Sequence, residues 1–537
     1  MKVKPGAFTR EEKSWILYDW ANSVYSTNMT AAIFPIYYAT IAGDDGNKWW
    51  GIGVSAASLL IALLAPLLGS IGDVRGMKKR MLAAFLLLGV LFTAFTAFVR
   101  DWRWMLLGYM LSHIGFSGAN VFYDAFLPDV TSRERMDKVS AWGYAMGYLG
   151  GSTIPFVLSI IALLITGFGE AAVKFSILLT SVWWALFSLP LLVHVRQTHY
   201  TEDPPSRLAA DTGKKLKATL SCIRANRGLA CFLLAYFFYI DGVNTVISLA
   251  TNYGATLGLG STGMILALLV TQLVAVPCSL LFSRLSRRVH TIHLISGAIA
   301  VYVLICGVGF FMGRSVEPYQ MAYTAAVREA AGRAAAASGM DRAAMRPILR
   351  DIREEGKDAL AAQDPAAAFY SVGDDGRESG VIGDALTHIR EGSKYAFPDG
   401  DARSAALRQI QAMKAPLLAF VSDTERQADY RRALQAASRL FWCMAVLVGT
   451  VQGGIQALSR SFFARLVPPK RANEYFGFFD IIGKFAAVMG PFLYSLFYML
   501  TGRASAGIVS LLILFGAGGL VLLIGRRQIL AASAQEA

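Results

Sequence analysis

The sequence is short of charged residues and of cysteine. Only 16% of its 537 residues are charged, whereas soluble domains average about a quarter. The five cysteines form no CxxC pair, and four of them fall in apolar segments, so the sequence predicts neither a disulfide framework nor a zinc site. We also expect no cleavable signal peptide, because the polar start at 1–14 leads into an apolar segment of more than signal-peptide length.

Motifs of enzyme chemistry are missing as well. The sequence contains no HExxH zinc motif, no GxSxG nucleophile elbow and no Walker-type phosphate-binding loop. We therefore expect a protein that is not an enzyme, that holds no metal and no cofactor, and that contains no ATP-driven pump of its own.

Long apolar runs dominate the sequence instead. A membrane-spanning helix needs about 20 mostly apolar residues. Twelve segments satisfy this requirement: 15–41, 50–72, 81–99, 104–127, 139–166, 173–195, 228–252, 262–283, 291–313, 439–463, 474–500 and 506–525. The sequence therefore predicts an all-α polytopic membrane protein.

The formal net charge of +14 is explained by the loops between these segments, so we expect no nucleic-acid partner. One set of loops carries 20 Lys and Arg residues, at 73–80, 129–139, 196–227, 284–290 and 464–474. The opposite set carries 5, at 43–49, 100–103, 167–174, 253–262 and 501–505. Cytoplasmic loops of membrane proteins are the basic ones. We therefore expect the first set and both termini in the cytoplasm.

The two halves of the chain repeat each other. Asp19 and Asn22 match Asp241 and Asn244 at an offset of 222, and a later pair of Pro-containing helices matches at an offset of 336. The increase in offset is explained by an Ala-rich, charged insert at 314–437 in the second half. Parallel six-helix repeats are the plan of major facilitator transporters. The fold that we predict is therefore a major facilitator fold of twelve transmembrane helices in two six-helix halves.

The repeat divides the chain into five predicted parts. They are an N-terminal six-helix half at 1–195, a cytoplasmic linker at 196–227, helices seven to nine at 228–313, the insert at 314–437, and helices ten to twelve with a short tail at 438–537. The insert holds 17 basic and 18 acidic residues. Its amphipathic patterns around 320–336 and 341–362 predict a helical cap or stalk on the extracytoplasmic face.

A glycine-rich loop links the second and third predicted helices. It reads Gly69-Ser-Ile-Gly-Asp73-Val-Arg-Gly76-Met-Lys-Lys-Arg80. The glycines permit a tight turn, and Asp73 can lie against a helix N-terminus, where the helix dipole favours an anion. The loop resembles the signature loop of the major facilitator superfamily, which implies a cytoplasmic gate with Arg80 as a candidate partner. The equivalent loop at 283–288 lacks the acid, so only the first copy should form the full latch.

Polar and charged side chains recur at helical spacing inside several predicted spans. They are Tyr18, Asp19, Asn22 and Tyr25 in the first helix, His113, Asn120 and Asp124 in the fourth, Asp241 and Asn244 in the seventh, Gln452, Gln456 and Arg460 in the tenth, and Asp480 and Lys484 in the eleventh. A charge at the bilayer centre costs about 2.5 kcal/mol or more, so we expect these residues to line a solute or ion pathway. Two alternatives stay open: polar side chains can join helices, at about 0.6 kcal/mol each, and Asp19 can be solvated at the cytoplasmic end of its helix.

The stretch from Tyr18 to Thr27 resembles the first-helix signature of the vacuole effluxer family, a branch of the major facilitator superfamily. Further similar stretches are Phe126–Asp129, Gly143–Gly151, Tyr239–Ile247, Val451–Ser461 and Gly483–Ala487. The resemblance covers the membrane domain and fails across 314–437. The resemblance implies that Asp129 is a partner for the basic end of the glycine-rich loop. The fungal members of the family are similar to exporters of neutral amino acids from the vacuole.

Together these patterns predict a secondary active transporter that exports small polar or zwitterionic solutes by alternating access, with protons as a candidate coupling ion. A lipid-like substrate is an alternative, and so is a non-transporting membrane receptor or scaffold with 314–437 as its sensing domain. We expect a monomer in the lipid bilayer, in the inner membrane of a bacterium or in the vacuolar membrane of a eukaryote.

Overall fold

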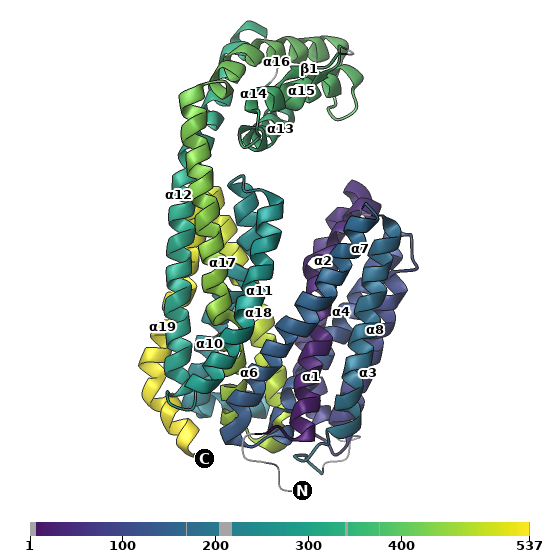
Figure 1. Ribbon diagram of the computed structural model, residues 1–537, viewed down its shortest axis with the longest axis vertical. Coiled ribbons are helices and arrows are strands. Elements are labelled where there is room, and N and C mark those ends of the chain that lie inside the picture. Colours follow the sequence, from purple (N-terminus) through teal and green to yellow (C-terminus); the bar gives the residue numbers. More distant parts are fainter. Residues whose placement is uncertain (1–6, 168, 203–216, 339–341, 375, 536–537) are drawn as a thin grey trace.

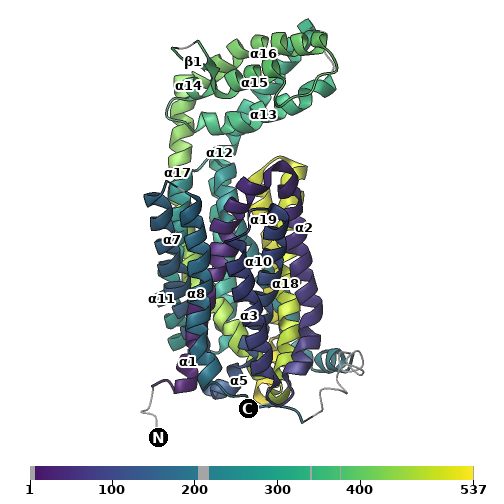
Figure 2. The same ribbon diagram turned by 90° about the vertical axis from the view of Figure 1, so that its right-hand side faces the viewer.

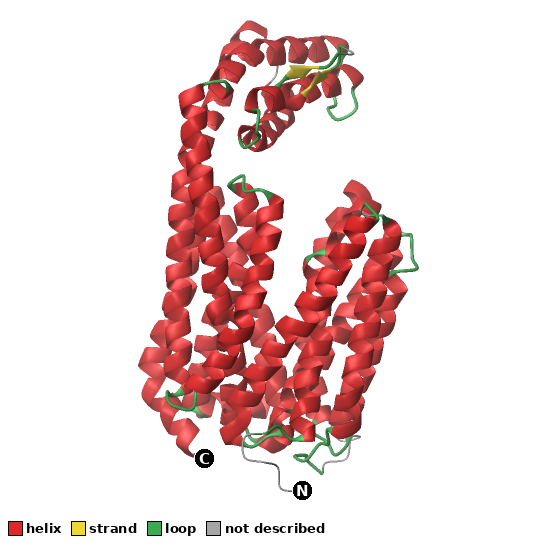
Figure 3. Ribbon diagram, in the orientation of Figure 1, coloured by secondary structure: helices red, strands yellow, loops and turns green. Residues whose placement is uncertain are grey.

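The computed structural model describes residues 7–167, 169–202, 217–338, 342–374 and 376–535. Figure 1 shows two bundles of long helices, with a smaller helical cap beyond one end. Figure 3 shows that the described chain is helical apart from its loops and one short hairpin in the cap.

The first bundle is formed by the N-terminal half. Its elements are α1 (Arg10–Tyr25), the π-helical segment η1 (Ser26–Ala31), α2 (Ile33–Gly72), α3 (Met77–Thr96), α4 (Trp102–Ala125), α5 (Leu127–Val130), the 3₁₀ turn η2 (Arg133–Arg135), α6 (Met136–Met146), the π-helical segment η3 (Gly147–Thr153), α7 (Ile154–Ile165) and α8 (Glu170–His194).

The second bundle and the cap are formed by the C-terminal half. The bundle contains α10 (Arg227–Thr256), α11 (Ser261–Leu285), α12 (Thr291–Ser338), α17 (Thr424–Leu466), the 3₁₀ turn η4 (Pro469–Arg471), α18 (Ala472–Thr501) and α19 (Ala504–Gln535). The cap contains α13 (Arg342–Leu360), α14 (Pro365–Phe369), β1 (Ser371–Val372), β2 (Glu378–Ser379), α15 (Gly380–Glu391) and α16 (Gly400–Val421).

Helix α2 turns back on itself and holds parts of two spans. The rings of Tyr38 and Trp50 lie 4.8 Å apart. Twelve residues of straight helix would separate them by about 18 Å along the axis. The first span is therefore divided among α1, η1 and the start of α2, and the second span is the segment Trp49–Gly72.

Ten helices among the described residues are long and apolar enough to cross a membrane. Two predicted spans are not among them. The first is interrupted by η1, and α4 has sufficient length but carries polar residues such as His113, Asn120 and Asp124. With these two, the bundle agrees with the predicted major facilitator fold of twelve spans.

The cap is continuous with the second bundle. Helices α12 and α17 run without a break from the bundle into the cap, so the predicted boundaries at 313/314 and 437/438 lie inside helices. The predicted amphipathic helices correspond to the end of α12 and to α13. The hydroxyl of Tyr323 in α12 donates to the carbonyl of Ile352 in α13 at 2.8 Å, which ties the first cap helix to the end of α12. Figures 1 and 2 place the cap at the end opposite both termini.

The two bundles meet near the termini, and Figure 1 shows them diverging toward the cap. The crossing of α2 and α18 depends on glycine. A Cβ on Gly69 would lie 2.4 Å from the carbonyl oxygen of Asn473, and a Cβ on Gly477 would lie 2.7 Å from that of Ala65. Because larger residues would clash with backbone at both points, the glycines allow α2 and α18 to touch. This contact closes the space between the bundles at the end where both termini lie, which we call the terminus side.

Candidate functional site

A polar cavity of about 410 Å³ lies between the two bundles. Its walls are formed by both halves, with Asn120 and Asp124 from α4, Asn244 from α10, Gln456 and Arg460 from α17, and Asp480 and Lys484 from α18. A neighbouring space of about 360 Å³ shares much of this lining and adds Asp19, Asn22 and Gln452. The two spaces form one region between the halves, and ten of the predicted pathway residues line it.

Arg460 occupies the centre of this region and is only 3% exposed. Its guanidinium donates to Asp19 Oδ2 at 3.1 Å and to Asp124 Oδ1 at 3.0 Å. It also donates to the Ser140 hydroxyl at 2.9 Å and to the Ser140 carbonyl at 3.2 Å. Since Arg460 belongs to α17 and its partners to α1, α4 and α6, this one side chain ties the second half to three helices of the first.

Aromatic rings and a glycine complete the Arg460 site. The guanidinium carbon lies 4.6 Å from the ring centre of Trp15 and 4.5 Å from that of Tyr144, close enough for cation–π attraction. A Cβ on Gly143 would lie 2.2 Å from Asp19 Oδ2. Any larger residue at this position would displace the carboxylate from Arg460.

Asp480 and Lys484 form an ion pair on the cavity side of α18. Lys484 Nζ donates to Asp480 Oδ2 at 2.6 Å, with the acid four residues ahead of the base. Their side chains are 23% and 20% exposed. The pair is therefore accessible from the cavity, and a charged solute can compete for either member.

We expect Lys484→Met to impair transport with little effect on stability. The unpaired Asp480 can be hydrated by the cavity, so the loss of this partly exposed pair should lower the free energy of unfolding by about 1 kcal/mol or less. Flux and thermal unfolding of the purified protein, with Lys484→Arg as the charge-preserving control, measure the two effects. A Lys484→Met protein with full flux would remove the pair from the pathway.

Four predicted pathway residues lie behind the cavity lining. The ring of Tyr18 packs 4.5 Å from that of Tyr123, and the ring of Tyr25 packs 4.4 Å from that of Phe116. His113 lies 3.2 Å from the Ser58 hydroxyl and stacks on a tyrosine. Asp241 is buried between α10 and α18. Tyr18, Tyr25 and His113 pack helices together, which corrects their placement on the cavity wall. Asp241 also lies behind this wall, but as a carboxylate whose Oδ2 has no hydrogen-bond partner.

Three residues around Arg460 were not predicted as site residues. Ser140 carries no distinguishing signal in the sequence, since an isolated serine in a span resembles any helix-packing residue. Trp15 belongs to an apolar run and reads as a core aromatic. Tyr144 lies in the Gly143–Gly151 stretch, which was noted only for its resemblance to a family.

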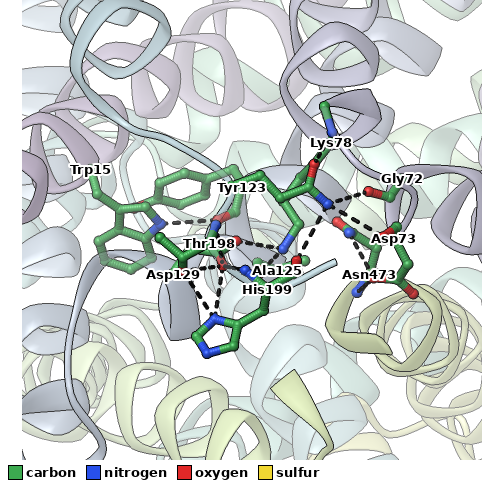
Figure 4. Close-up of polar contacts among 12 residues, drawn as sticks. Trp15, Gly72, Asp73, Lys78, Tyr123, Ala125, Asp129, Thr198, His199 and Asn473 are labelled. Atoms are coloured by element: carbon green, nitrogen blue, oxygen red, sulfur yellow. Dashed lines mark hydrogen bonds and ion pairs between the residues drawn. The ribbon is translucent and has the colours of Figure 1, made fainter. Parts of the chain in front are cut away.

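The predicted loop between the second and third spans forms a contact between the halves (Figure 4). Asp73 Oδ1 accepts hydrogen bonds from the backbone N–H and the side-chain amide of Asn473, at 2.9 and 2.8 Å. Asp73 Oδ2 accepts from the Glu474 N–H at 3.0 Å. Helix α18 begins at Ala472, so these donors belong to its first turn. Asp73 therefore lies against a helix N-terminus, as the sequence predicts.

The basic partner in this loop is Lys78, whereas Arg80 was predicted. Lys78 is fully buried, and its ammonium group donates to Asp129 Oδ2 at 2.7 Å and to the Ala125 carbonyl at 3.0 Å. Arg80 is exposed. Gly76 adopts a φ of 74°, which turns the chain at the start of α3. That turn directs Lys78 inward toward the predicted acid, Asp129, and leaves Arg80 two residues further along the helix.

The start of the linker is bound to the same loop, as Figure 4 shows. Asp129 Oδ1 accepts from the backbone N–H groups of Thr198 and His199, at 3.1 and 2.8 Å. The Thr201 N–H donates to the Asp73 carbonyl at 2.8 Å. Burial raises the pKa of Asp129, but Lys78 and the linker donors outweigh it and lower the pKa from 3.8 to about 2. The ionised Asp129 carboxylate therefore stabilises the folded protein fully above pH 3.8, and this stabilisation is lost as the pH falls through about 2.

Sequence comparisons match the chain to transporters. Residues 52–319 and 437–528 match the model of a family described as "Vacuole effluxer Atg22 like". The "Uncharacterized MFS-type transporter YxiO" of Bacillus subtilis (strain 168) is 34% identical over 529 residues, which cover 96% of this chain and 94% of that protein. "Autophagy-related protein 22" of Cryptococcus neoformans var. neoformans serotype D (strain B-3501A) is 29% identical over 184 residues, covering 33% of this chain and 32% of the relative.

Solved structures share the fold at low sequence identity. The chain is similar to FucP, a major facilitator transporter in the outward conformation, with a TM-score of 0.52, 9% identity, and coverage of 96% of this chain and 97% of FucP. It is also similar to the proton:xylose symporter XylE bound to 6-bromo-6-deoxy-D-glucose, with a TM-score of 0.51, 10% identity, and coverage of 97% and 94%. At this identity the likeness establishes the major facilitator fold alone.

Proposed function

The chain belongs to the vacuole effluxer Atg22-like family, whose members are major facilitator transporters, and from this premise we propose that it exports small zwitterionic solutes such as neutral amino acids. It is an integral membrane transporter of small molecules and not an enzyme.

The observation that supports it is the charge of the cavity. Lys484 and Asp480 present a cation and an anion side by side on α18, and Asp124 faces the same space. A zwitterion carries its carboxylate and its ammonium group a few ångströms apart. Its carboxylate can therefore bind Lys484 while its ammonium group binds Asp480 or Asp124, with the amides of Asn120 and Gln456 as neutral partners.

A lipid-like substrate fits this cavity poorly. An acyl chain placed beside Asp124, Arg460 and the Asp480–Lys484 pair would leave these charged groups without water or a polar partner. The desolvation of an unpaired charge in a protein interior is costly. The polar lining therefore favours a compact, hydrophilic solute.

Alternating access requires contacts that open on each side in turn. In this structure the terminus side is closed by Asp73 at the start of α18 and by Arg460 between the halves. A solute ammonium group that binds Asp124 would compete with Arg460 for that carboxylate. Solute binding would then weaken the contacts that hold the terminus side closed, which couples the solute to the conformational change.

Binding to the purified protein tests this proposal. We expect a neutral amino acid to raise thermal stability, by about 2.7 kcal/mol at a concentration of 100 times Kd. The amino-acid amide and the N-acetyl amino acid each lack one charge and serve as matched controls that should have little effect. Equal stabilisation by all three compounds, or stabilisation by a lipid alone, would argue against a zwitterion site.

The proposal places both termini and the linker in the cytoplasm and the cap outside. The basis is the bias of Lys and Arg toward the loops on the terminus side. We expect reporters at residue 537 and within 196–227 to be cytoplasmic, and a reporter at Gly376 to lie outside. Impermeant labelling of whole cells measures this, and a cytoplasmic Gly376 would invert the topology. The membrane would be the plasma membrane in a bacterium and the vacuolar membrane in a eukaryote.

A further inference from the structure

Asp241 is a carboxylate buried in the membrane domain with no cation beside it. It lies in α10 and is 0% exposed. Its Oδ1 accepts from the Gly490 N–H at 2.9 Å and from the Thr245 hydroxyl at 3.4 Å. Its Oδ2 has no hydrogen-bond partner and is shielded from solvent. One oxygen is thus held by α18 and the other is left without a donor.

The carboxylates that line the cavity differ from Asp241 because each of them is paired with a cation. Asp19 and Asp124 both face Arg460, and Asp480 faces Lys484. Asp241 takes part in no ion pair within the described part of the chain. Its equivalent in the sequence repeat is Asp19, so the two halves place the same residue type in opposite electrostatic surroundings.

The helices packed against α10 supply no free charge to Asp241. They are α11, α17, α18 and α19, and near its end α10 also contacts α12, where the Tyr253 hydroxyl donates to the Gly309 carbonyl. No charged residue occurs in α19 before Arg526 or in α11 before Arg284. The cations of α17 and α18 that line the cavity are both engaged: Arg460 binds Asp19 and Asp124, and Lys484 binds Asp480. The buried phenol of Tyr239 in α10 is hydrogen-bonded to Ser459, and the phenols of Tyr236 in α10 and Tyr494 in α18 carry no charge when protonated.

An ionised carboxylate in such a place would be strongly destabilised, because neither water nor a cation compensates the charge. We infer that Asp241 carries a proton in this conformation and is the binding site of the coupling ion. The inference rests on the proposed transport function and names the ion that the transporter exchanges. The proton that Asp241 binds sits on Oδ2, the oxygen without a donor, while Oδ1 continues to accept from Gly490.

A proton fits the space around Asp241, and a metal ion does not. A metal ion needs several oxygen ligands around it. A Cβ on Gly490 would lie 2.0 Å from Thr245 Oγ1 and 2.9 Å from Asp241 Oδ1, so the two helices leave no room for an added atom on the Oδ1 side. Among the described residues, no group of three or more His, Cys, Asp or Glu side chains is placed to hold a metal ion. A proton requires no such shell.

The position of Asp241 connects it to both parts of the site. Ile240 and Asn244, its neighbours on α10, line the cavity. Gly490, its partner, belongs to α18, which also carries the Asp480–Lys484 pair and the Asn473 contact with Asp73. A movement of α18 that admits water to Asp241 would allow the proton to leave. The protonation of Asp241 and the opening of the terminus side would therefore depend on each other.

Infrared spectroscopy of the purified transporter tests the protonation without any solute. We expect the wild-type protein near neutral pH to show a carbonyl stretch of a protonated carboxylic acid that is absent from Asp241→Asn. The cap variant Asp401→Asn, at an exposed acid, should keep the band. If Asp241→Asn fails to fold, Asp241→Glu should shift the band. A wild-type spectrum in which no such band depends on Asp241 would overturn the inference.

Transport in proteoliposomes tests the coupling. We expect Asp241→Asn to retain solute counterflow without an ion gradient and to lose accumulation driven by a pH gradient. Accumulation at the wild-type level in Asp241→Asn would overturn the role in coupling. Absence of amino-acid counterflow in the wild-type protein would instead contradict the proposed solute. The infrared measurement would still decide independently whether Asp241 is protonated, because it uses no solute.

Discussion

Arg460→Met is expected to abolish transport and to lower the free energy of unfolding by about 3–5 kcal/mol, the usual cost of removing one partner from a buried ion pair. The Arg460 side chain is only 4% exposed and pairs with two carboxylates at once. Without it, the Asp19 carboxylate, whose side chain is 12% exposed, loses its cation and repels Asp124 beside the cavity. The loss of the links from α17 to α1, α4 and α6 should also release the terminus side.

Thermal unfolding and flux assays of Arg460→Met separate these two effects. Adding Asp19→Asn and Asp124→Asn to the variant should restore most of the stability, since no buried charge then lacks a partner, but should not restore transport. Arg460→Lys serves as a charge-preserving control and should lose transport because an ammonium group cannot reach three helices with a forked geometry. Wild-type stability and flux in Arg460→Met would contradict a central role for this residue.

Asp73→Asn is expected to reduce transport strongly while the protein inserts in normal amounts. The substitution keeps the shape of the side chain but removes the negative charge that accepts from the first turn of α18. A hydrogen bond to a charged group contributes about 1.5–3 kcal/mol, and every 1.4 kcal/mol changes an equilibrium about tenfold. The balance between the two conformations should therefore shift by at least tenfold toward the one open on the terminus side.

Accessibility of the cavity measures this shift. A cysteine at Ser117, which lines the cavity, should react with an impermeant thiol reagent from the terminus side faster in the Asp73→Asn background than in the wild-type background. The exposed loop variant Arg80→Gln is the matched control and should leave the reaction rate unchanged. Equal rates in Asp73→Asn and the control, with full flux, would show that the loop is an ordinary turn.

The sequence was sufficient for the membrane fold and for the expectation that Asp73 lies against a helix N-terminus, because both depend on local patterns. It did not identify that helix as α18, whose Asn473 lies 400 residues further along the chain. Apolar runs of spanning length define the helices. A glycine-rich turn with one acid, followed by a basic helix start, predicts that Asp73 lies at a helix N-terminus. Arg460 and the Asp480–Lys484 pair were identified for a similar reason, since a charge inside an apolar segment needs a partner. That Asp19 and Asp124 are both partners of Arg460 depends on how three helices pack, which no spacing along the chain reveals.

Tyr18, Tyr25 and His113 were misplaced because helical spacing gives a face of a helix and not its neighbour. Aromatic rings on α4 and α8 cover the face that bears Tyr25, with Phe116 at 4.4 Å and Trp184 at 5.6 Å. Lys78 was missed for a related reason, since the positive φ of Gly76 decides which basic residue turns inward.

Counterflow of a radiolabelled neutral amino acid into proteoliposomes that contain the same unlabelled amino acid distinguishes a zwitterion transporter from the alternatives. It needs no ion gradient and no assumption about direction. We expect transient accumulation of the label by the wild-type protein, and none by Arg460→Met or by liposomes without protein. Failure of the wild-type protein to exchange any zwitterion, with exchange of a lipid or a purely anionic solute instead, would contradict the assignment of the cavity.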